Sequence, residues 1–387
     1  MTDQHAAQRR QIIQSARTVV VKVGTNALSK PDDTLDVEKI ANLTEQLHRV
    51  RQSGRQVVLV SSGAIGSGLG ILGLKKRPDD LPHLQAAAAI GQAHLIRQYD
   101  DCLQRFGLHA AQLLLTANDF KQRHRYLNVR NTLHTLFEYG VLPIVNENDT
   151  VSVDEIRFGD NDRLAALVTN LLDQPPLLVI LSVIDGLYDG DPSLPGSRVI
   201  PLIEQFDEAL FQFASLSKSS RGTGGMQTKL EAARIATAVG RPVIIANGRN
   251  PRILDEILAG EPVGTLFLPQ GPSVSARERW IGYNVTPRGR YVLDEGAGRA
   301  IVQKGRSLLA IGIKSIQGEF DKGQIVSLVD PTGHELGRGL TNYSSVDATR
   351  IAGKRTDEFA AIFGNIPYAE VIHRDNLVVT VNGLKAG

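Results

Sequence analysis

Residues 19–23 read VVVKV and are followed by GTN at 24–26. An apolar run this rich in β-branched valine predicts a strand that is buried on both faces of a sheet. Lys22 interrupts the run two residues before Gly24. A buried ammonium is costly unless it meets a counter charge, so we expect Lys22 to emerge at the sheet edge beside an anion or a carboxylate. The alternative is a structural lysine at a strand end.

Similar apolar runs recur along the first two thirds of the chain and alternate with helical patterns. Strands are predicted at VVLV (57–60), AQLLL (111–115), LPIV (142–145), LLVIL (177–181) and PVIIA (242–246). Helices are predicted at about 36–53, 83–106, 125–139, 162–172 and 226–239. Asp36 is the expected N-cap of the first helix, and Gly54 is its expected stop. The pattern predicts an α/β fold, an open and mostly parallel sheet sandwiched by helices, whose ligands bind where the strands end.

The pattern changes after about residue 275, where glycine recurs every few residues and helical periodicity nearly vanishes. Short apolar runs predict a small C-terminal β-barrel, at AIV (300–302), SLLAIGIKSI (307–316), QIVSLVD (324–330) and VVTV (378–381). The expected organisation is an N-terminal extension (1–17), an α/β domain (18–268), a linker (269–280) and a β domain (281–387).

Composition agrees with a two-domain globular protein of 387 residues. The net charge of +2 argues against both a nucleic-acid-binding polycation and an acidic tail. The single cysteine, Cys102, excludes a disulfide within the chain and a multi-cysteine metal site. The N-terminus lacks the apolar run of a signal peptide, and no apolar stretch is long enough to span a bilayer. We therefore expect a cytoplasmic protein without a membrane segment.

Two glycine-rich segments are candidate anion sites. VSSGAIGSG (60–68) follows a predicted strand, and GTGGMQTK (222–229) precedes a predicted helix. Backbone N–H groups in such turns can converge on one anion, although a simple tight turn is the alternative for the first segment. The second segment is neither a P-loop nor a dinucleotide fingerprint, because its lysine and its strand are wrongly placed. Lys229 would add a point charge near the same oxygens.

Polar residues gather after one predicted strand and at the start of one predicted helix. VNENDTV (145–151) leaves a buried strand with four polar side chains, and FGDNDRL (158–164) opens a helix of which capping explains only one residue. Such a cluster suits a polar zwitterion, with a carboxylate for its ammonium. Two lysines, two anion turns and this cluster together favour phosphoryl transfer, in which positioning and positive charge dominate. The histidines show no metal-binding spacing, so no dedicated metal site is predicted.

The motifs together resemble the amino-acid kinase family. VKVGTN, SSGAIGSG, VNENDTV, FGDND and GTGGMQTK occur in the order and at the distances of that family. The resemblance is strongest to the members that phosphorylate the γ-carboxylate of L-glutamate, in the first step of proline biosynthesis. From LDEGAGRAIVQKGRSLLAIGI (293–313) onward, the chain resembles a PUA domain. The two resemblances cover nearly all of the chain after about residue 17.

This resemblance implies an ATP-dependent phosphotransferase with a carboxyl acceptor, and it implies a role for each matching residue. Lys22 and Lys229 would stabilise the moving phosphoryl group, and Asp162 would orient both lysines by ion pairing. The backbone N–H groups of Gly24, Gly63 and Gly225 would bind phosphate oxygens. The glutamate-binding residues would be Ser62, Asp149 and Asn161. The residues lining the nucleotide would be Ser182, Val183, Thr223, Gly224, Gly225, Met226, Gln227, Thr228 and Lys229.

The sequence departs from the family at one nucleotide contact. The family usually has Thr-Asp after the strand at 177–181, whereas this chain has Ser182 and Val183. The hydroxyl survives and the carboxylate is lost. Either Asp185, two residues on, takes over part of the contact, or the contact is absent.

The resemblance also implies partners. Mg²⁺ would enter with the nucleotide, proline would act as a feedback inhibitor, and the protein would form a homo-oligomer, a dimer or tetramer. A γ-glutamyl phosphate reductase could receive the labile product. RNA is an unfavoured ligand, because residues 271–387 hold 15 Lys and Arg against 12 Asp and Glu. The open alternatives are a kinase of the same fold for another acyl acceptor and an RNA-binding regulator.

Overall fold

The computed structural model describes residues 3–30, 34–74, 76–151, 161–216, 225–270, 281–282, 285–364 and 368–380. The chain divides into two units, Met1–Ser273 and Val274–Gly387. No helix in these described ranges is both long enough and apolar enough to cross a membrane.

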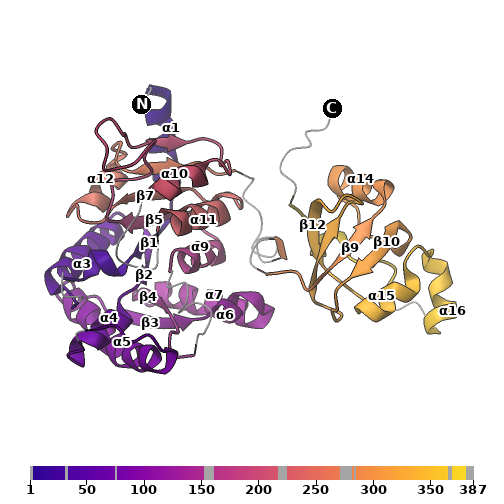
Figure 1. The fold of residues 1–387 in the computed structure, drawn as a ribbon, viewed down its shortest axis with the longest axis horizontal. Coiled ribbons are helices and arrows are strands. Elements are labelled where there is room, and N and C mark those ends of the chain that lie inside the picture. The colour runs from indigo at the N-terminus through magenta and orange to yellow at the C-terminus, as the bar shows by residue number, and fades with distance from the viewer. Residues whose placement is uncertain are drawn as a thin grey trace. The chain divides into compact units, whose positions relative to one another are not determined.

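An eight-stranded sheet forms the centre of the first unit, with the strand order β3-β4-β2-β1-β5-β7-β8-β6 (Figure 1). Its strands are β1 (Thr18–Val23), β2 (Gln56–Ser61), β3 (Ala110–Leu115), β4 (Leu142–Glu147), β5 (Pro176–Ser182), β6 (Leu202–Ile203), β7 (Val243–Asn247) and β8 (Thr265–Phe267). Neighbouring strands pair in parallel except β7 and β8. The predicted parallel α/β sheet is confirmed, and the six predicted strands are β1 to β5 and β7.

Helices cover both faces of this sheet, and Figure 1 shows α3 on one side with α9 and α11 on the other. The described helices of the unit are α1 (Asp3–Ser15), α2 (Thr25–Leu28), α3 (Val37–Gln52), α4 (Ala64–Ile71), α5 (Leu81–Gln104), α6 (Ala117–Lys121), α7 (Arg123–Glu138), α9 (Asn161–Leu171), α10 (Leu210–Leu216), α11 (Met226–Thr237) and α12 (Ile253–Ala259). The Asp36 carboxylate accepts a hydrogen bond from the backbone N–H of Lys39, so the predicted N-cap is confirmed.

The second unit contains a five-stranded mixed sheet with the order β10-β9-β11-β12-β13. Its strands are β9 (Gly289–Leu293), β10 (Ile313–Gln317), β11 (Ile325–Val329), β12 (Glu335–Leu340) and β13 (Leu377–Val379). Among the residues of this unit that the structure describes, three short α-helices accompany them, α14 (Glu295–Lys304), α15 (Ser345–Ile351) and α16 (Phe359–Phe363). Strands and helices share one buried core that includes Tyr291, Val326 and Phe359.

Two sequence interpretations of this unit are wrong. The run at 300–302, predicted as a strand, lies within α14, and the middle of 307–316 forms a 3₁₀ turn at Ala310–Gly312. The Asp294 carboxylate accepts from the backbone N–H of Ala297 and caps α14, while Gly305 ends it in the left-handed region. The glycines inside α14 hid its helical periodicity.

Candidate active site

Strand alternation decides which face of the sheet Lys22 meets. Val19, Val21 and Val23 of β1 belong to the buried cluster that also contains residues of α3 and α5. Because successive side chains of a strand point to opposite faces, Lys22 points to the other face, where α9 packs against β1. There its Nζ atom lies 2.5 Å from Oδ1 of Asp162, in the first turn of α9.

Lys229 reaches the second oxygen of the same carboxylate. Its Nζ donates to Oδ2 of Asp162 at 3.0 Å from the first turn of α11, and Thr228 Oγ1 donates to that oxygen at 3.0 Å. Asp162 is 0% exposed, and both lysines are buried. Two ammonium groups from distant parts of the chain thus share one carboxylate at the end of β1. Lys22, Lys229 and Asp162 together carry one net positive charge, which suits a site for an anion.

Burial alone would raise the pKa of the Asp162 carboxyl. The charges of Lys22 and Lys229, and the hydrogen bonds that these lysines donate, outweigh burial and hold the pKa well below its ordinary value. Asp162 is therefore a carboxylate at any pH at which the protein would work, and it keeps both lysines in place.

Three predicted glycines each precede the first turn of a helix, and two of them, Gly24 and Gly225, lie beside these lysines. Gly24 leads into α2, Gly63 into α4 and Gly225 into α11. Gly63 has φ = 109°, a left-handed conformation that favours glycine. A Cβ atom on Gly24 would lie 3.6 Å from Lys22 Nζ, so the backbone here approaches the ammonium closely. Backbone N–H groups at such helix starts are suited to phosphate oxygens.

The structure describes two of the remaining predicted nucleotide-lining residues of the 223–229 segment, Met226 and Gln227. Met226 is buried and Gln227 is exposed at the start of α11. Thr223 and Gly224 lie outside the described residues.

Ser62 and Asn161, predicted to bind substrate, are in direct contact. Asn161 Nδ2 lies 2.9 Å from Ser62 Oγ, 2.8 Å from the backbone oxygen of Ser61 and 2.8 Å from Oδ1 of Asn146. The ends of β2 and β4 and the start of α9 are thereby tied together. Asp162 follows Asn161 in the first turn of α9. The same turn therefore places Asp162 against the two lysines and Asn161 in the hydrogen-bond network with Ser62 and Asn146.

Asp149, the third predicted substrate residue, lines a cavity of about 270 Å³. The wall of the cavity includes Ala64, Ala88, Gln92, Glu147, Asp149 and Thr150. Two carboxylates therefore face a hollow at the end of β4, next to the network that contains Asn161. Such a wall suits a ligand that carries an ammonium group.

The Ser182–Val183 departure lies at the end of β5. The backbone oxygen of Ser182 accepts from the N–H of Gly248 at 2.8 Å, so the turns after β5 and β7 are joined. Asp185 accepts from Asn247 Nδ2 at 2.8 Å and from Tyr188 Oη at 2.9 Å. Asp185 is thus held at the edge where the family's usual carboxylate is missing.

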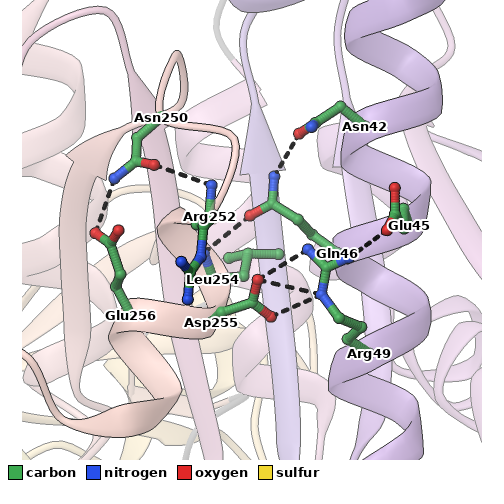
Figure 2. Close-up of polar contacts among 9 residues, drawn as sticks. All are labelled: Asn42, Glu45, Gln46, Arg49, Asn250, Arg252, Leu254, Asp255 and Glu256. Carbon is green, nitrogen blue, oxygen red and sulfur yellow. Dashed lines mark hydrogen bonds and ion pairs between the residues drawn. The ribbon is translucent and has the colours of Figure 1, made fainter.

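Hydrogen bonds and an ion pair join α3 to the first turn of α12, as Figure 2 shows. Arg49 donates to both oxygens of Asp255, at 2.9 Å from Nε and 2.8 Å from Nη2, and the backbone N–H of Leu254 donates to Gln46 Oε1 at 3.0 Å. The first turn of α12 is therefore fixed to α3. This anchors the turn that joins β7 to α12, which begins beside Asn247.

Sequence reasoning missed several side chains that the structure brings to these contacts. Thr228 was expected to line the nucleotide, but its bond to Asp162 was not foreseen, and the roles of Asn247 and Gln92 in hydrogen bonding were not considered. Gln92 offered a signal, because it is an amide in the alanine-rich run AAAAIGQA (86–93) of a mostly buried helix face. A buried amide in such a run needs a polar partner.

Comparison with known proteins identifies the family. The model of the amino acid kinase family matches residues 17–247, and the model of the PUA domain matches residues 289–363. The chain belongs to the amino acid kinase family. Its resemblance to the glutamate-phosphorylating members of that family is confirmed by close relatives. The family is one of ATP-dependent kinases, as expected from the motifs.

Two relatives within the amino acid kinase family illustrate the match. The glutamate 5-kinase of Rhodopirellula baltica is 48% identical over 375 residues, which cover 96% of each chain. The glutamate 5-kinase of Trichormus variabilis is 49% identical over 368 residues, covering 94% of this chain and all of the relative. Among solved structures, the carbamate kinase from Giardia lamblia matches with a TM-score of 0.48 and 19% identity, over 66% of this chain and 99% of that chain.

Proposed function

We propose that this protein transfers the γ-phosphoryl group of ATP to the γ-carboxylate of L-glutamate. The products are ADP and γ-glutamyl phosphate, and the reaction is the first step of proline biosynthesis. The observation that carries the proposal is the pair of ammonium groups of Lys22 and Lys229 on the Asp162 carboxylate, one residue from the Asn161 network. The high identity to glutamate 5-kinases along nearly the whole chain supports glutamate as the acceptor.

The reaction needs charge stabilisation more than proton transfer. An oxygen of the substrate carboxylate forms a bond to the γ-phosphorus while the bond from that phosphorus to the β,γ-bridging oxygen breaks, and ADP leaves with the electron pair. The carboxylate is already anionic, so no general base is required. Lys22 and Lys229 stabilise the negative charge on the transferred oxygens, and Asp162 keeps both ammonium groups aimed at one place.

Glutamate is recognised by the groups at the ends of β2 and β4. Ser62 and Asn161 form one part of this site, and Asp149 provides a carboxylate for the substrate ammonium. Alanine side chains and Asp149 line the same cavity, which gives room for the aliphatic stem beside a polar wall. A hydroxyl, an amide and a carboxylate together match a small zwitterion with a second carboxylate.

ATP occupies the edge formed by the ends of β5 and β7 and the start of α11. Ser182, Val183 and the 223–229 segment line it, and the N–H groups of Gly24, Gly63 and Gly225 bind phosphate oxygens. Asp185 supplies part of the contact that Val183 cannot make. An Asp185→Ala variant then has a raised KM for ATP, and an unchanged KM would show that the contact is absent.

Mg²⁺ would be carried in by ATP and would supply further positive charge beside the phosphates. Within the described residues, no three His, Cys, Asp or Glu side chains form a metal-binding group, and both oxygens of Asp162 are engaged by lysines. Binding through the nucleotide fits these residues better than a dedicated protein site.

The wider assignments follow from the same function. We propose a kinase domain at 18–268 and a PUA-like domain at 281–387, with 1–17 as an extension and 269–280 as the linker. Proline acts as a feedback inhibitor at or overlapping the glutamate site, the protein is a cytoplasmic homo-oligomer, and a γ-glutamyl phosphate reductase takes the product.

The test is glutamate-dependent release of ADP, with the acyl phosphate trapped as its hydroxamate. Lys229→Ala should lower kcat by about 10²- to 10³-fold, because a charge aimed at the transferred group is lost. Asp149→Ala should raise the KM for glutamate about tenfold or more, because a charged hydrogen bond is lost. Lys76→Ala is the control, since Lys76 is a surface residue outside the site.

Three outcomes would contradict the proposal. Turnover with another carboxylic acid in preference to glutamate would move the protein to a different acceptor. Full activity of Lys229→Ala would remove the proposed charge stabilisation. An unchanged KM for glutamate in Asp149→Ala would show that the substrate site is wrongly assigned.

A further inference from the structure

Three buried amide side chains lie in a row beside the proposed substrate site. Asn146 Nδ2 on β4 donates to Gln92 Oε1 on α5 at 2.7 Å, and Asn161 Nδ2 on α9 donates to Asn146 Oδ1 at 2.8 Å. Gln92, Asn146 and Asn161 are 8%, 2% and 6% exposed. The row joins α5, β4 and α9.

Two backbone groups fix which way the amides face. The backbone N–H of Glu147 donates to Asn146 Oδ1 at 2.8 Å, and the backbone oxygen of Ser61 accepts from Asn161 Nδ2 at 2.8 Å. A backbone N–H can only donate and a carbonyl can only accept, so neither asparagine can be turned over without losing a bond. Asn146 must then present its NH₂ group to Gln92, whose contacting atom must be its oxygen.

One hydrogen-bond acceptor in this row of amides has no partner in the described part of the chain. Asn161 Oδ1 is buried and has no hydrogen-bond partner among the described residues. A buried polar atom without a partner is costly, and a ligand that donates a hydrogen bond would remove the cost. Fully ionised glutamate has only one group that can donate, its α-ammonium. The orientation of the row therefore prepares Asn161 Oδ1 for that ammonium.

We propose that Gln92 is a positioning residue that determines substrate specificity by holding Asn146, and through it Asn161, with the Asn161 oxygen facing the substrate ammonium. The proposal rests on the function proposed above for the site. Nothing in the motifs that identify the family marks Gln92.

Gln92 matters because its side-chain oxygen accepts the hydrogen bond from the Asn146 NH₂ group. Without it, Asn146 Nδ2 would be a buried donor with no partner. The side chain of Asn146 can escape this cost by turning its NH₂ group toward the cavity of about 270 Å³ that Gln92 lines. That rotation gives up the bond from the backbone N–H of Glu147 and withdraws Asn146 Oδ1 from Asn161, so the Asn161 amide is held by fewer bonds.

The experiment compares two substitutions of Gln92 in the full-length protein. Gln92→Met keeps the length of the side chain and removes the acceptor, so the KM for glutamate should rise about tenfold while the KM for ATP stays unchanged. Gln92→Glu keeps an acceptor oxygen for Asn146 and should restore much of the loss. Gln98→Met, on the same helix, is the matched control because Gln98 takes no part in the row.

A double-mutant cycle tests whether Gln92 acts through Asn161. In an Asn161→Ala background, Gln92→Met should add nothing to the rise in the KM for glutamate, because the atom that it positions is gone. Where a variant turns over too slowly, the rise in melting temperature caused by glutamate replaces KM as the measure.

Two results would overturn the proposal: an unchanged KM for glutamate in Gln92→Met, or an equal rise with and without the Asn161 side chain. The unmodified protein is assayed alongside. If it fails to phosphorylate glutamate, the proposed function is wrong. If it phosphorylates glutamate normally while Gln92→Met behaves like it, only the positioning role is wrong.

Discussion

Asp162 balances the charge of the proposed active site, and its replacement tests that balance. Asp162→Asn keeps the shape of the side chain but leaves Lys22 and Lys229 buried with a neutral partner. Breaking a buried ion pair in this way costs about 3–5 kcal/mol, so we expect the free energy of unfolding at neutral pH to fall by about that amount. Urea denaturation followed by circular dichroism measures it. Turnover should fall as well, because the lysines lose their common anchor.

The pH dependence of this effect has a definite sign. Because the folded-state pKa of Asp162 lies below its ordinary value of 3.8, its stabilisation is fully present above about pH 4 and is lost as the pH falls through the lower folded value. The stability gap between the unmodified protein and Asp162→Asn should therefore be constant from neutral pH to about pH 5 and shrink below pH 4. A gap that widens on acidification would contradict the ion-pair geometry. Asp79→Asn, at an exposed ion pair, should change little.

At the residue scale, the sequence predicted that Lys22 would meet a carboxylate or an anion, and the structure places Asp162 there. Alternation along a strand and the cost of a buried charge were sufficient for that inference. The row of Gln92, Asn146 and Asn161 could not be predicted in the same way. Hydrogen bonds between side chains 54 positions apart depend on how α5 lies over β4, which no local pattern specifies.

At the scale of elements, the crossing of α4 and α5 places Gln92 beside the site. A Cβ atom on Gly91 would lie 1.9 Å from the backbone oxygen of Ala64 and 2.3 Å from the backbone nitrogen of Gly68. One on Gly68 would lie 1.8 Å from the backbone oxygen of Ala87. The two helices therefore touch backbone to backbone, and neither glycine leaves room for a side chain.

Gly91→Ala tests this close crossing, because the direction in which it changes the stability of the protein depends on the crossing. In an exposed helix, replacing glycine with alanine stabilises by about 1 kcal/mol through helix propensity. At Gly91 we expect the opposite, a loss of about 1–3 kcal/mol or more, because two backbones must move apart. The midpoint of urea denaturation measures the change, and any increase in stability would contradict the close crossing. A rise in the KM for glutamate should accompany the loss, because Gln92 moves with its neighbour.

Helices with clear local start and stop signals were predicted well, whereas the glycine-rich helix α14 was not. Helix α3 has an Asp36 cap, a regular apolar face and a glycine stop, all of which are local signals. Helix α14 has comparable caps at Asp294 and Gly305, but Gly296 and Gly298 interrupt its pattern. Its helical state depends on packing Ile301 into the core of the second unit, which is a tertiary effect.

At the scale of the whole molecule, every described residue of the proposed catalytic site lies in the first unit, Met1–Ser273. The second unit contributes its own sheet and its own core around Tyr291 and Phe359. The role of the second unit is therefore separate from phosphoryl transfer. RNA binding is one candidate role, and the charge of the unit bears on it. PUA resemblance alone suggests RNA, whereas the residues from 271 onward carry an excess of only three positive charges.

We expect the full-length protein to bind RNA weakly and without saturation at physiological salt. Affinity for nucleic acid comes largely from neutralised phosphates, and about six to ten phosphate contacts are typical of proteins that bind tightly. An excess of three charges, distributed among acidic residues, supplies fewer. Filter binding with a structured RNA and a single-stranded RNA, repeated from low to physiological salt, measures the affinity. Tight, saturable binding with a steep salt slope would contradict the expectation. It would also assign the second unit to RNA, because the surplus positive charge of the proposed catalytic site is buried between β1, α9 and α11.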